Sequence, residues 1–219
     1  MRSIQSKLLI CFFMTILATG CATVQPYDYS AYKRNHPRSI LVLPPVNNSP
    51  DVNATYSMFS QLTYPLAESG YYIFPAALVD ETFKQNGLST PADIHAVAPA
   101  KLQQIFGADA ALYVTITNYG TSYTIINSAA VVAANAKLVD LKTGNLLWQG
   151  AATASSDEGQ SNTGGGLAGL LITAIIMQIA NTTMDVSHKV AGVASQRLLF
   201  ARQPNGILNG PRSPNYGKD

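Results

Sequence analysis

The sequence has few residues from which a disulfide or a metal site could be built, with two cysteines and three histidines among 219 residues. Cys11 lies inside the first apolar run of the chain and Cys21 just after it, so the body of the protein has no cysteine pair. His36, His95 and His188 lack both the i, i+4 spacing and the neighbouring cysteines that a zinc site needs. We therefore expect surface histidines, no metal, and stability that comes from packing.

Residue combinations that carry catalysis are also lacking. The sequence has no G-x-S-x-G motif, which would place a serine on a nucleophile elbow. Its paired acids, Asp80–Glu81 and Asp157–Glu158, are adjacent in sequence, so their side chains diverge instead of meeting at one bond. We expect a protein that is not an enzyme.

One nucleotide-like motif, G-x-G-x-x-G, occurs at Gly164–Gly169. A dinucleotide site needs a strand directly before this motif and a second parallel strand after its helix. Here a polar loop precedes the glycines and only about fifty residues follow, too few to complete the unit. We interpret the motif as a flexible start to an apolar helix and expect no cofactor.

The N-terminus has the pattern of a secretory signal peptide: basic residues, an apolar run over residues 8–17, then small residues. The run is about ten residues long, too short to span a bilayer. Ala18-Thr19-Gly20-Cys21 resembles the lipobox of bacterial lipoproteins. Residues 1–20 are then the signal peptide, and Cys21 carries acyl chains that hold the protein on a membrane. Ala22, in place of an Asp retention signal, favours the outer membrane.

The alternative is an ordinary secretory signal with a chance cysteine. In either case, loss of residues 1–20 removes Arg2 and Lys7 and leaves twelve basic and twelve acidic residues. A neutral chain has no electrostatic footprint for a phosphate backbone, so we expect no nucleic-acid partner.

Hydrophobic periodicity predicts one domain over residues 38–202, with helices between the first two strands and three adjacent strands afterwards. The predicted strands cover residues 39–43, 71–74, 110–117, 122–141 and 146–154. The predicted helices cover residues 50–69, 78–86, 100–106, 167–182 and 186–202, and a further N-cap lies at Thr90. The first helix is predicted to start with Ser49 as N-cap, Pro50 at N1 and Asp51 in the first turn. Its apolar face follows at helical spacing and comprises Val52, Tyr56, Phe59, Leu62 and Leu66. This order indicates an α/β fold whose mixed sheet is parallel at its N-terminal part and an antiparallel meander at its C-terminal part, flanked by helices.

Residues 21–37, before the domain, look like a lipidated tether, and residues 203–219, after it, look like an irregular tail. The tether and an uncharged segment inside the domain, residues 159–184, are the candidates for an interface. Tyr27, Tyr29 and Tyr32 either lie along the tether itself or pack on the domain or on a partner. Residues 159–184 carry no charge, which suits a buried helix, an interface helix or membrane insertion. The candidate interface residues are Tyr27, Tyr29, Tyr32, Leu167, Leu170, Leu171, Ile175 and Ile176.

Six stretches together resemble a neisserial-type lipoprotein family of unknown function. They are ILVLPPVNNSPDV (40–52), GYYIFPAALVDETF (70–83), DIHAV (93–97), QIFGADAALYVTIT (104–117), YGTSY (119–123) and NGILNGPR (205–212). The resemblance implies a fold similar to the N-terminal domain of TolB and to the periplasmic domain of CsgG. It also implies a component of an envelope or secretion assembly, and it supplies no catalytic residues.

The leading hypothesis is therefore a non-enzymatic outer-membrane lipoprotein that faces the periplasm. It would act as an adaptor for a CsgG-like partner, with self-association into a homo-oligomer as a further expectation. The alternative is a periplasmic lipoprotein that binds a small ligand or a glycan through aromatic side chains of the meander. The aromatic side chains in question are Tyr113, Tyr119 and Tyr123.

Overall fold

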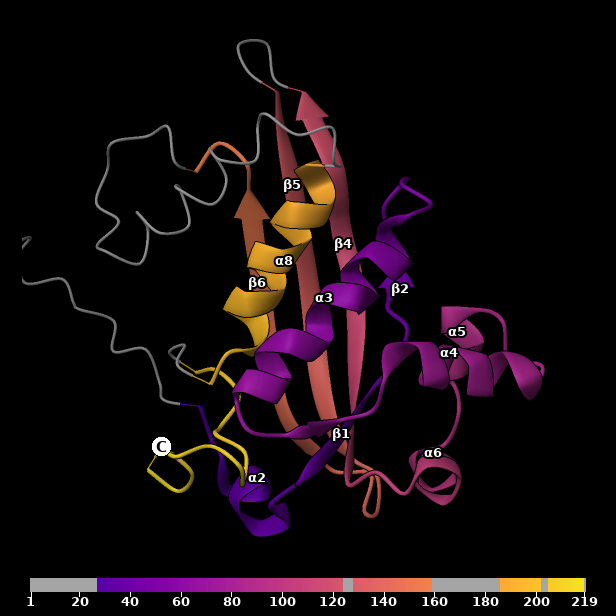
Figure 1. Ribbon diagram of the computed structural model, residues 1–219, viewed down its shortest axis with the longest axis vertical. Helices are drawn as coiled ribbons and strands as arrows, with labels where there is room; N and C mark the ends of the chain where they lie inside the picture. The colour runs from indigo at the N-terminus through magenta and orange to yellow at the C-terminus, as the bar shows by residue number, and fades with distance from the viewer. Residues whose placement is uncertain (1–26, 124–127, 159–185, 202–204, 219) are drawn as a thin grey trace, which may run out of the picture.

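A single mixed β-sheet organises the protein in the computed structural model, which describes residues 27–123, 128–158, 186–201 and 205–218 (Figure 1). The strands are β1 (Ser39–Val42), β2 (Val46–Asn47), β3 (Tyr72–Ile73), β4 (Ala110–Tyr123), β5 (Ser128–Asp140) and β6 (Leu146–Ser155). The helices are α2 (Ser30–Asn35), α3 (Ala54–Glu68), α4 (Ala76–Gln85), α5 (Pro91–His95), α6 (Pro99–Phe106) and α8 (Val186–Leu199).

The sheet has the strand order β3-β1-β4-β5-β6. β1 pairs in parallel with both β3 and β4, and β4, β5 and β6 pair antiparallel. The predicted α/β fold with a parallel part and an antiparallel meander is confirmed. The turn between β5 and β6 also lies where predicted, with Gly144 at φ 75°, a conformation that glycine adopts without strain.

The first strand is interrupted by Pro44 and Pro45, which have no N–H to donate to a neighbouring strand. The chain resumes as β2 and pairs with the same strand, since Val42 lies opposite Leu112 and Val46 opposite Thr115. The short strand β2 was not predicted. Its position brings the end of the parallel part alongside the middle of β4.

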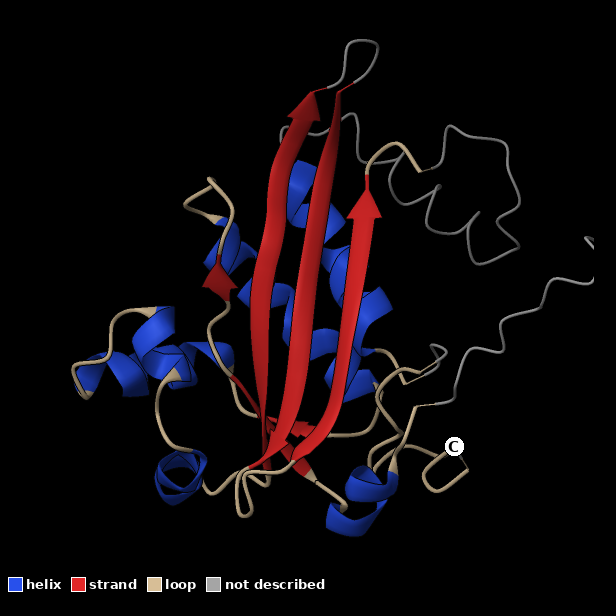
Figure 2. Cartoon of the chain, turned by 180° about the vertical axis from the view of Figure 1, so that it is seen from behind, coloured by secondary structure: helices blue, strands red, loops and turns tan. Residues whose placement is uncertain are grey.

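Helices α3 and α8 cover one face of the meander and enclose the core (Figure 1). The residues buried there include Met58, Leu62 and Leu66 of α3 and Val190, Ala194 and Leu198 of α8. On the sheet side they include Leu112, Val114, Leu138 and Trp148. Each fully buried aliphatic side chain of this kind contributes about 1.5–3 kcal/mol. Seen from behind, the opposite face of β4, β5 and β6 has no covering helix among the described residues (Figure 2).

Helix α3 begins four residues later than predicted, at Ala54 instead of Pro50. Ser49, the predicted N-cap, does not cap the helix, because its backbone N–H and its hydroxyl donate to Asn47 Oδ1 at 2.8 and 2.7 Å. Asp51, predicted in the first helical turn, accepts a hydrogen bond from the backbone N–H of Asn53 at 2.8 Å and holds a turn there. Val52, predicted on the apolar face, is 85% exposed as a result. Phe59 of the same predicted face is buried, as expected.

The segment predicted as a tether has structure from Tyr27 onwards. Residues 30–35 form α2, and Tyr32 is buried. The tail has no helix or strand over residues 205–218, as predicted, but it packs closely on the domain. Ile207 is buried, and the N–H of Gly210 donates to the carbonyl of Ser69 at 2.7 Å. The two ends of the chain thus share one region of the domain surface.

Within the described residues, no helix combines the length and the hydropathy needed to cross a membrane. The predicted helix over residues 167–182 lies outside the part of the chain that the structure describes.

Candidate functional site

The uncovered face of the meander presents alternate residues of three adjacent strands. Because side chains alternate across a strand, the residues paired in register with one another stand in rows on this face. Tyr113, Lys137 and Gln149 form one such row. Thr115, Asn135 and Ala151 form the next. Of these six, Asn135, Lys137, Gln149 and Ala151 are exposed.

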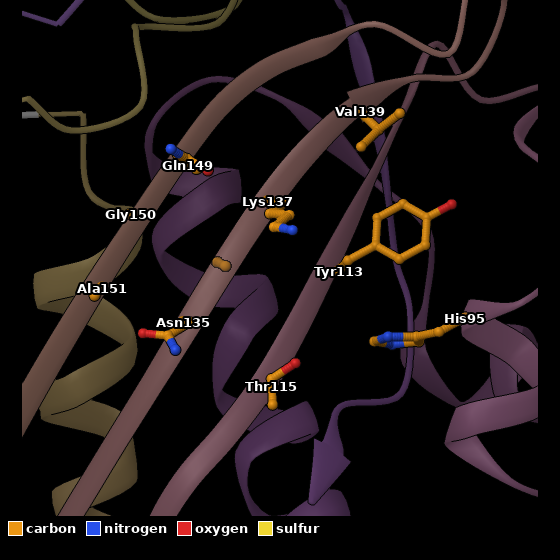
Figure 3. Close-up of a pocket in the computed structure, with 10 residues that line it drawn as sticks. His95, Tyr113, Thr115, Asn135, Lys137, Val139, Gln149, Gly150 and Ala151 are labelled. Carbon is orange, nitrogen blue, oxygen red and sulfur yellow. The ribbon is translucent and has the colours of Figure 1, made fainter.

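These rows line a hollow of about 720 Å³ (Figure 3). Its floor is low at Ala151 of β6, which has a short side chain, and His95 of α5 stands on the opposite side. The lining residues include one cation, Lys137, together with amide and hydroxyl groups, and no carboxylate, serine or cysteine. We call this hollow the open-face groove.

His95 forms the wall of the open-face groove. It lies at the end of α5, whose start is fixed by the predicted cap: the Thr90 hydroxyl accepts a hydrogen bond from the Asp93 N–H at 3.2 Å. His95 Nε2 lies 3.0 Å from the carbonyl oxygen of Pro44, and since a carbonyl only accepts, Nε2 carries the proton. Burial lowers the pKa of His95, so the ring is neutral at neutral pH and its Nδ1 is an acceptor.

Tyr113 packs against that ring. The two ring centroids are 5.2 Å apart at an interplanar angle of 80°, the edge-to-face arrangement that aromatic pairs prefer. Burial raises the pKa of Tyr113, so its phenol is a neutral hydrogen-bonding group. The open-face groove therefore combines an aromatic pair with amides and one lysine. This set can bind and orient a partner through hydrogen bonds and aromatic contact.

The outer edge of β6, by contrast, is occupied by side chains. The backbone N–H of Gln149 donates to the hydroxyl of Tyr27 at 3.1 Å, and Arg197 Nη1 donates to the carbonyl of Thr153 at 2.8 Å. Side chains that cover an edge in this way prevent the addition of a further strand. Any partner of the meander is therefore expected on the open face and not on this edge.

The tether tyrosines pack on their own domain. The Tyr32 hydroxyl lies 2.5 Å from that of Tyr71, and the Tyr29 hydroxyl donates to the carbonyl of Gly206. Tyr27 and Tyr29 are half-buried, with ring centroids 4.9 Å apart. Their role in an interface stays a prediction. Tyr32 is buried in this conformation, so it is not accessible to a partner. Cys21 and the residues Leu167, Leu170, Leu171, Ile175 and Ile176 lie outside the described part of the chain.

The three meander tyrosines that suggested a glycan site do not share a face. A register shift between Ile116 and Asn118 introduces a bulge in β4. As a result Tyr113 lies in the open-face groove, whereas Tyr119 is buried on the helix side, its hydroxyl 2.5 Å from Ser57 Oγ. The side chain of Tyr123 is outside the described set.

The histidines are more involved in packing than predicted. His188 was expected on a helix surface, but Nδ1 lies 2.8 Å from Ser57 Oγ and Nε2 lies 2.7 Å from Gln61 Nε2, between α3 and α8. His95 was likewise expected at the surface and instead forms the groove wall. Among the described residues, no group of three or more His, Cys, Asp or Glu side chains is placed to hold a metal ion.

Sequence reasoning missed the polar members of the groove, Asn135, Lys137 and Gln149. A signal was present in Asn135-Ala136-Lys137, where polar residues alternate with alanine along a predicted strand. It showed that one face of the strand is polar, but not that α5 would stand beside that face.

The structure defines an α/β domain with a groove on the open face of its mixed sheet. The chain belongs to the family described as "Putative lipoprotein GNA1162-like", whose model matches residues 27–212. The predicted family is thereby confirmed. That family is a lipoprotein family, which agrees with a lipid anchor on this chain.

Similar proteins come from Neisseria meningitidis, and a more distant structural neighbour comes from Salmonella enterica. A relative from serogroup B, "Putative lipoprotein NMB1124/NMB1162", is 50% identical over 209 residues, which cover 94% of this chain and 96% of the relative. The crystal structure of lipoprotein GNA1162 is 55% identical, covering 67% of this chain and 100% of that chain, with a TM-score of 0.54. The LpoB C-terminal domain from Salmonella enterica is 18% identical, covering 58% of this chain and 98% of that one, with a TM-score of 0.40. The predicted similarity to TolB and CsgG stays a prediction.

Proposed function

We propose that this protein is a lipid-anchored accessory subunit of a bacterial envelope assembly, and that it binds a protein partner on its open-face groove. The family and the lipobox ending at Cys21 support the anchor. The absence of a carboxylate, serine or cysteine among the groove-lining residues favours binding over catalysis.

The observation that carries the proposal is the composition of the open face. An antiparallel sheet often leaves one face in water, and such a face is usually polar throughout. Here Tyr113, Val139 and Ala151 are mixed with Asn135 and Lys137 in one hollow. Interfaces combine an apolar or aromatic centre with hydrogen-bonding groups around it, and this face has both.

The breadth of the site favours a protein over a small molecule. Ligand pockets typically enclose 70–90% of a drug-sized ligand. The floor of this groove is exposed at Asn135, Lys137, Gln149 and Ala151, so a small molecule lying on it would keep much of its surface in water. A protein segment that offers a carboxylate to Lys137 and carbonyl or N–H groups to the amides fits the chemistry better.

From the family resemblance, the partner we expect is a CsgG-like lipoprotein in the same envelope. The absence of Asp after Cys21 favours the outer membrane, with the domain in the periplasm. Substitution Cys21→Ser tests the anchor alone: the protein should move from the membrane fraction to the soluble fraction. Unchanged membrane association of that variant would contradict the anchor.

Partner binding is tested with one substitution in the groove and one matched control. Ala151 is exposed on the groove floor and Ala77 is exposed on α4, so Ala→Arg adds the same bulk and charge at either place without entering the core. Wild type, Ala151→Arg and Ala77→Arg are purified by affinity from detergent-solubilised native membranes, and co-purifying proteins are quantified by mass spectrometry.

We expect a stoichiometric partner with wild type and with Ala77→Arg, and its loss with Ala151→Arg. A stoichiometric partner retained by Ala151→Arg would exclude the open-face groove as its binding site. Recovery of wild type alone would exclude a stable envelope partner.

A second candidate function is the binding of an envelope glycan or other small ligand. It is favoured by the size of the hollow, about 720 Å³, and by Tyr113 beside the Asn135 and Gln149 amides. A ligand that binds only the native state raises the unfolding temperature, so a thermal-shift screen against envelope glycans tests it. Absence of any shift at saturating glycan would count against this candidate.

A further inference from the structure

Positive charge is concentrated in the two segments that meet at one end of the domain. Residues 27–38 and 205–219 together contain five Lys and Arg residues and two Asp residues. The rest of the chain after residue 20 contains seven basic and ten acidic residues. The neutral total therefore conceals a basic end and an acidic remainder. The five cations are Lys33, Arg34, Arg38, Arg212 and Lys218.

Contacts bring these two segments onto one surface. The hydroxyl of Tyr216 lies 3.2 Å from Nδ1 of His36, which joins the tail to the end of α2. Arg38 and Arg212 flank Tyr72: the Tyr72 N–H donates to the carbonyl of Arg38 at 3.0 Å, and the Arg212 guanidinium lies 5.5 Å from the Tyr72 ring. Figure 1 shows α2 and the C-terminal tail side by side at the foot of the sheet. We call the exposed part of these segments the anchor-side surface.

Nearby acids offset only part of this charge. Asp109 Oδ2 accepts hydrogen bonds from the backbone N–H groups of Arg38 and Ser39, at 2.9 and 3.0 Å. Glu68 borders the opposite flank of the tail, and Asp28 lies beside α2. Arg38 Nε also lies 4.0 Å from Asp109 Oδ2, an exposed ion pair. The five Lys and Arg side chains on this surface are all exposed, and they outnumber the two Asp residues of the same segments.

Apolar surface accompanies the cations. A pocket of about 210 Å³ lies between α2 and the tail, lined by Tyr32, Tyr71, Leu208 and Tyr216 with Lys33 at its border. Tyr216 is 43% exposed. Basic side chains next to exposed tyrosine and apolar surface are typical of proteins that lie on a membrane–water interface.

The position of this surface along the chain indicates what covers it. Only residues 22–26 separate Cys21 from Tyr27, where the described chain begins. The six residue steps from Cys21 to Tyr27 span at most about 20 Å when fully extended. An anchor at Cys21 thus keeps this end of the domain close to the bilayer, where a basic surface meets phospholipid headgroups.

We propose that the anchor-side surface docks on anionic phospholipid headgroups, and that the lipidated protein uses this contact as a second membrane signal that fixes its orientation. The open-face groove, on the meander, is a separate surface and stays available to a partner. This proposal rests on the anchor of the proposed function for its geometry. The charge-dependent contact itself does not need the acyl chains, which makes it testable without them.

The experiment uses the mature chain with Cys21→Ser, which has no acyl chains. Its binding is measured by co-sedimentation with vesicles of phosphatidylcholine alone and of phosphatidylcholine with phosphatidylglycerol. Arg34→Gln with Arg38→Gln removes two cations from the anchor-side surface. Lys84→Gln with Lys101→Gln removes two exposed cations from α4 and α6, outside this surface and outside the open-face groove. The pair Arg212→Gln with Lys218→Gln serves as an independent second test if the first pair alters the circular dichroism spectrum.

We expect binding to the anionic vesicles only, lost at high salt as exposed charges are screened. Each cation near an anionic surface contributes about a fivefold change in affinity, so the anchor-side pair should weaken binding about 25-fold. The control pair should leave binding within about twofold of the parent chain. Equal binding to both vesicles, equal weakening by the control pair, or displacement by inorganic phosphate at constant ionic strength would overturn the proposal.

The docking proposal and the lipid anchor can be contradicted independently of each other. Loss of membrane anchoring in cells with Cys21→Ser concerns the acyl chains, whereas vesicle binding by the same variant concerns the basic surface. A Cys21→Ser chain that binds no vesicles overturns the docking proposal and leaves the anchor untouched.

Discussion

A pair of hydrogen-bonded tyrosines, Tyr32 and Tyr71, links the first and last described segments of the chain to the domain. The structure predicts which of the two hydroxyl groups contributes more to stability. Tyr71 donates its hydroxyl proton to the carbonyl of Leu208 at 2.6 Å. Tyr32 lies 2.5 Å from the Tyr71 hydroxyl and must be the donor there, because the proton of Tyr71 is already used. Both side chains are 3% exposed, so groups left without a partner here have little access to water.

Substitution Tyr71→Phe removes the central hydroxyl and takes a partner from both Leu208 and Tyr32. A buried polar group left without a partner costs about 1–3 kcal/mol, so we expect a loss of this size in the free energy of unfolding. Tyr32→Phe removes the hydrogen bond to Tyr71, leaves Tyr71 bonded to Leu208, and should cost about 0.5–1.5 kcal/mol. The double variant should be less destabilised than the sum of the two single changes, because both substitutions remove the same hydrogen bond between Tyr32 and Tyr71.

The assay is urea unfolding of the mature Cys21→Ser chain, followed by fluorescence. Trp148 is the single tryptophan of the chain, it is buried, and its Nε1 donates to the carbonyl of Asn205 at 2.9 Å. It therefore reports on the region where the tail packs. Unchanged m-values would confirm that stability alone is altered. A Tyr32→Phe loss larger than that of Tyr71→Phe, or simple additivity in the double variant, would refute the proposed direction of the hydrogen bonds.

Three further predictions concern backbone, pH and the sheet edge. Gly70→Ala should lower the free energy of unfolding by more than about 1 kcal/mol, because an alanine at φ 93° is strained and its Cβ would lie 2.3 Å from the N of Ser213. Gly87→Ala, at φ 78° in open space, is the control, and calorimetry should show a smaller loss of stability for it. Burial lowers the pKa of His95 below its usual 6.5, so the unfolded chain takes up the proton first as the pH falls. The free energy of unfolding should therefore fall as the pH drops through 6.5. His95→Gln should flatten that part of the plot of urea midpoint against pH, and an unchanged slope would contradict the burial argument. Arg197→Ala uncovers the carbonyl of Thr153 on the edge of β6, so it should increase self-association measured by light scattering. A scattering mass equal to that of the parent chain would show that this cover is dispensable.

Features set by neighbouring residues were predictable from the sequence. The Lys142–Asn145 turn, the stop at Pro44, the Thr90 cap and the change to period two at Ala110 each depend on a few adjacent residues. These signals were sufficient for the element order and hence for the mixed sheet. The start of α3 was misplaced because the predicted cap, Ser49, donates to Asn47 Oδ1 and Asp51 forms a turn with Asn53, local hydrogen bonds that compete with capping.

Features that join distant residues were not predictable in the same way. Tyr32 is buried by Tyr71 and by the tail near Leu208, and nothing in the tether sequence distinguishes such a tyrosine from an exposed one. The bulge near Thr117 moves Tyr119 to the opposite face from Tyr113, because one inserted residue reverses the alternation of all that follow. The groove itself depends on α5 standing beside β4, which only the assembled fold determines.

The central claim, that the open face of the meander is a partner-binding surface, is most directly tested by site-specific photo-crosslinking in intact cells. A photo-activatable residue replaces Asn135 in the open-face groove or, as the control, Ser89, which is exposed outside it. The account predicts a discrete crosslinked adduct with one envelope protein from position 135 and none from position 89. An adduct from position 89 alone, or none from either position while the partner still co-purifies, would contradict it.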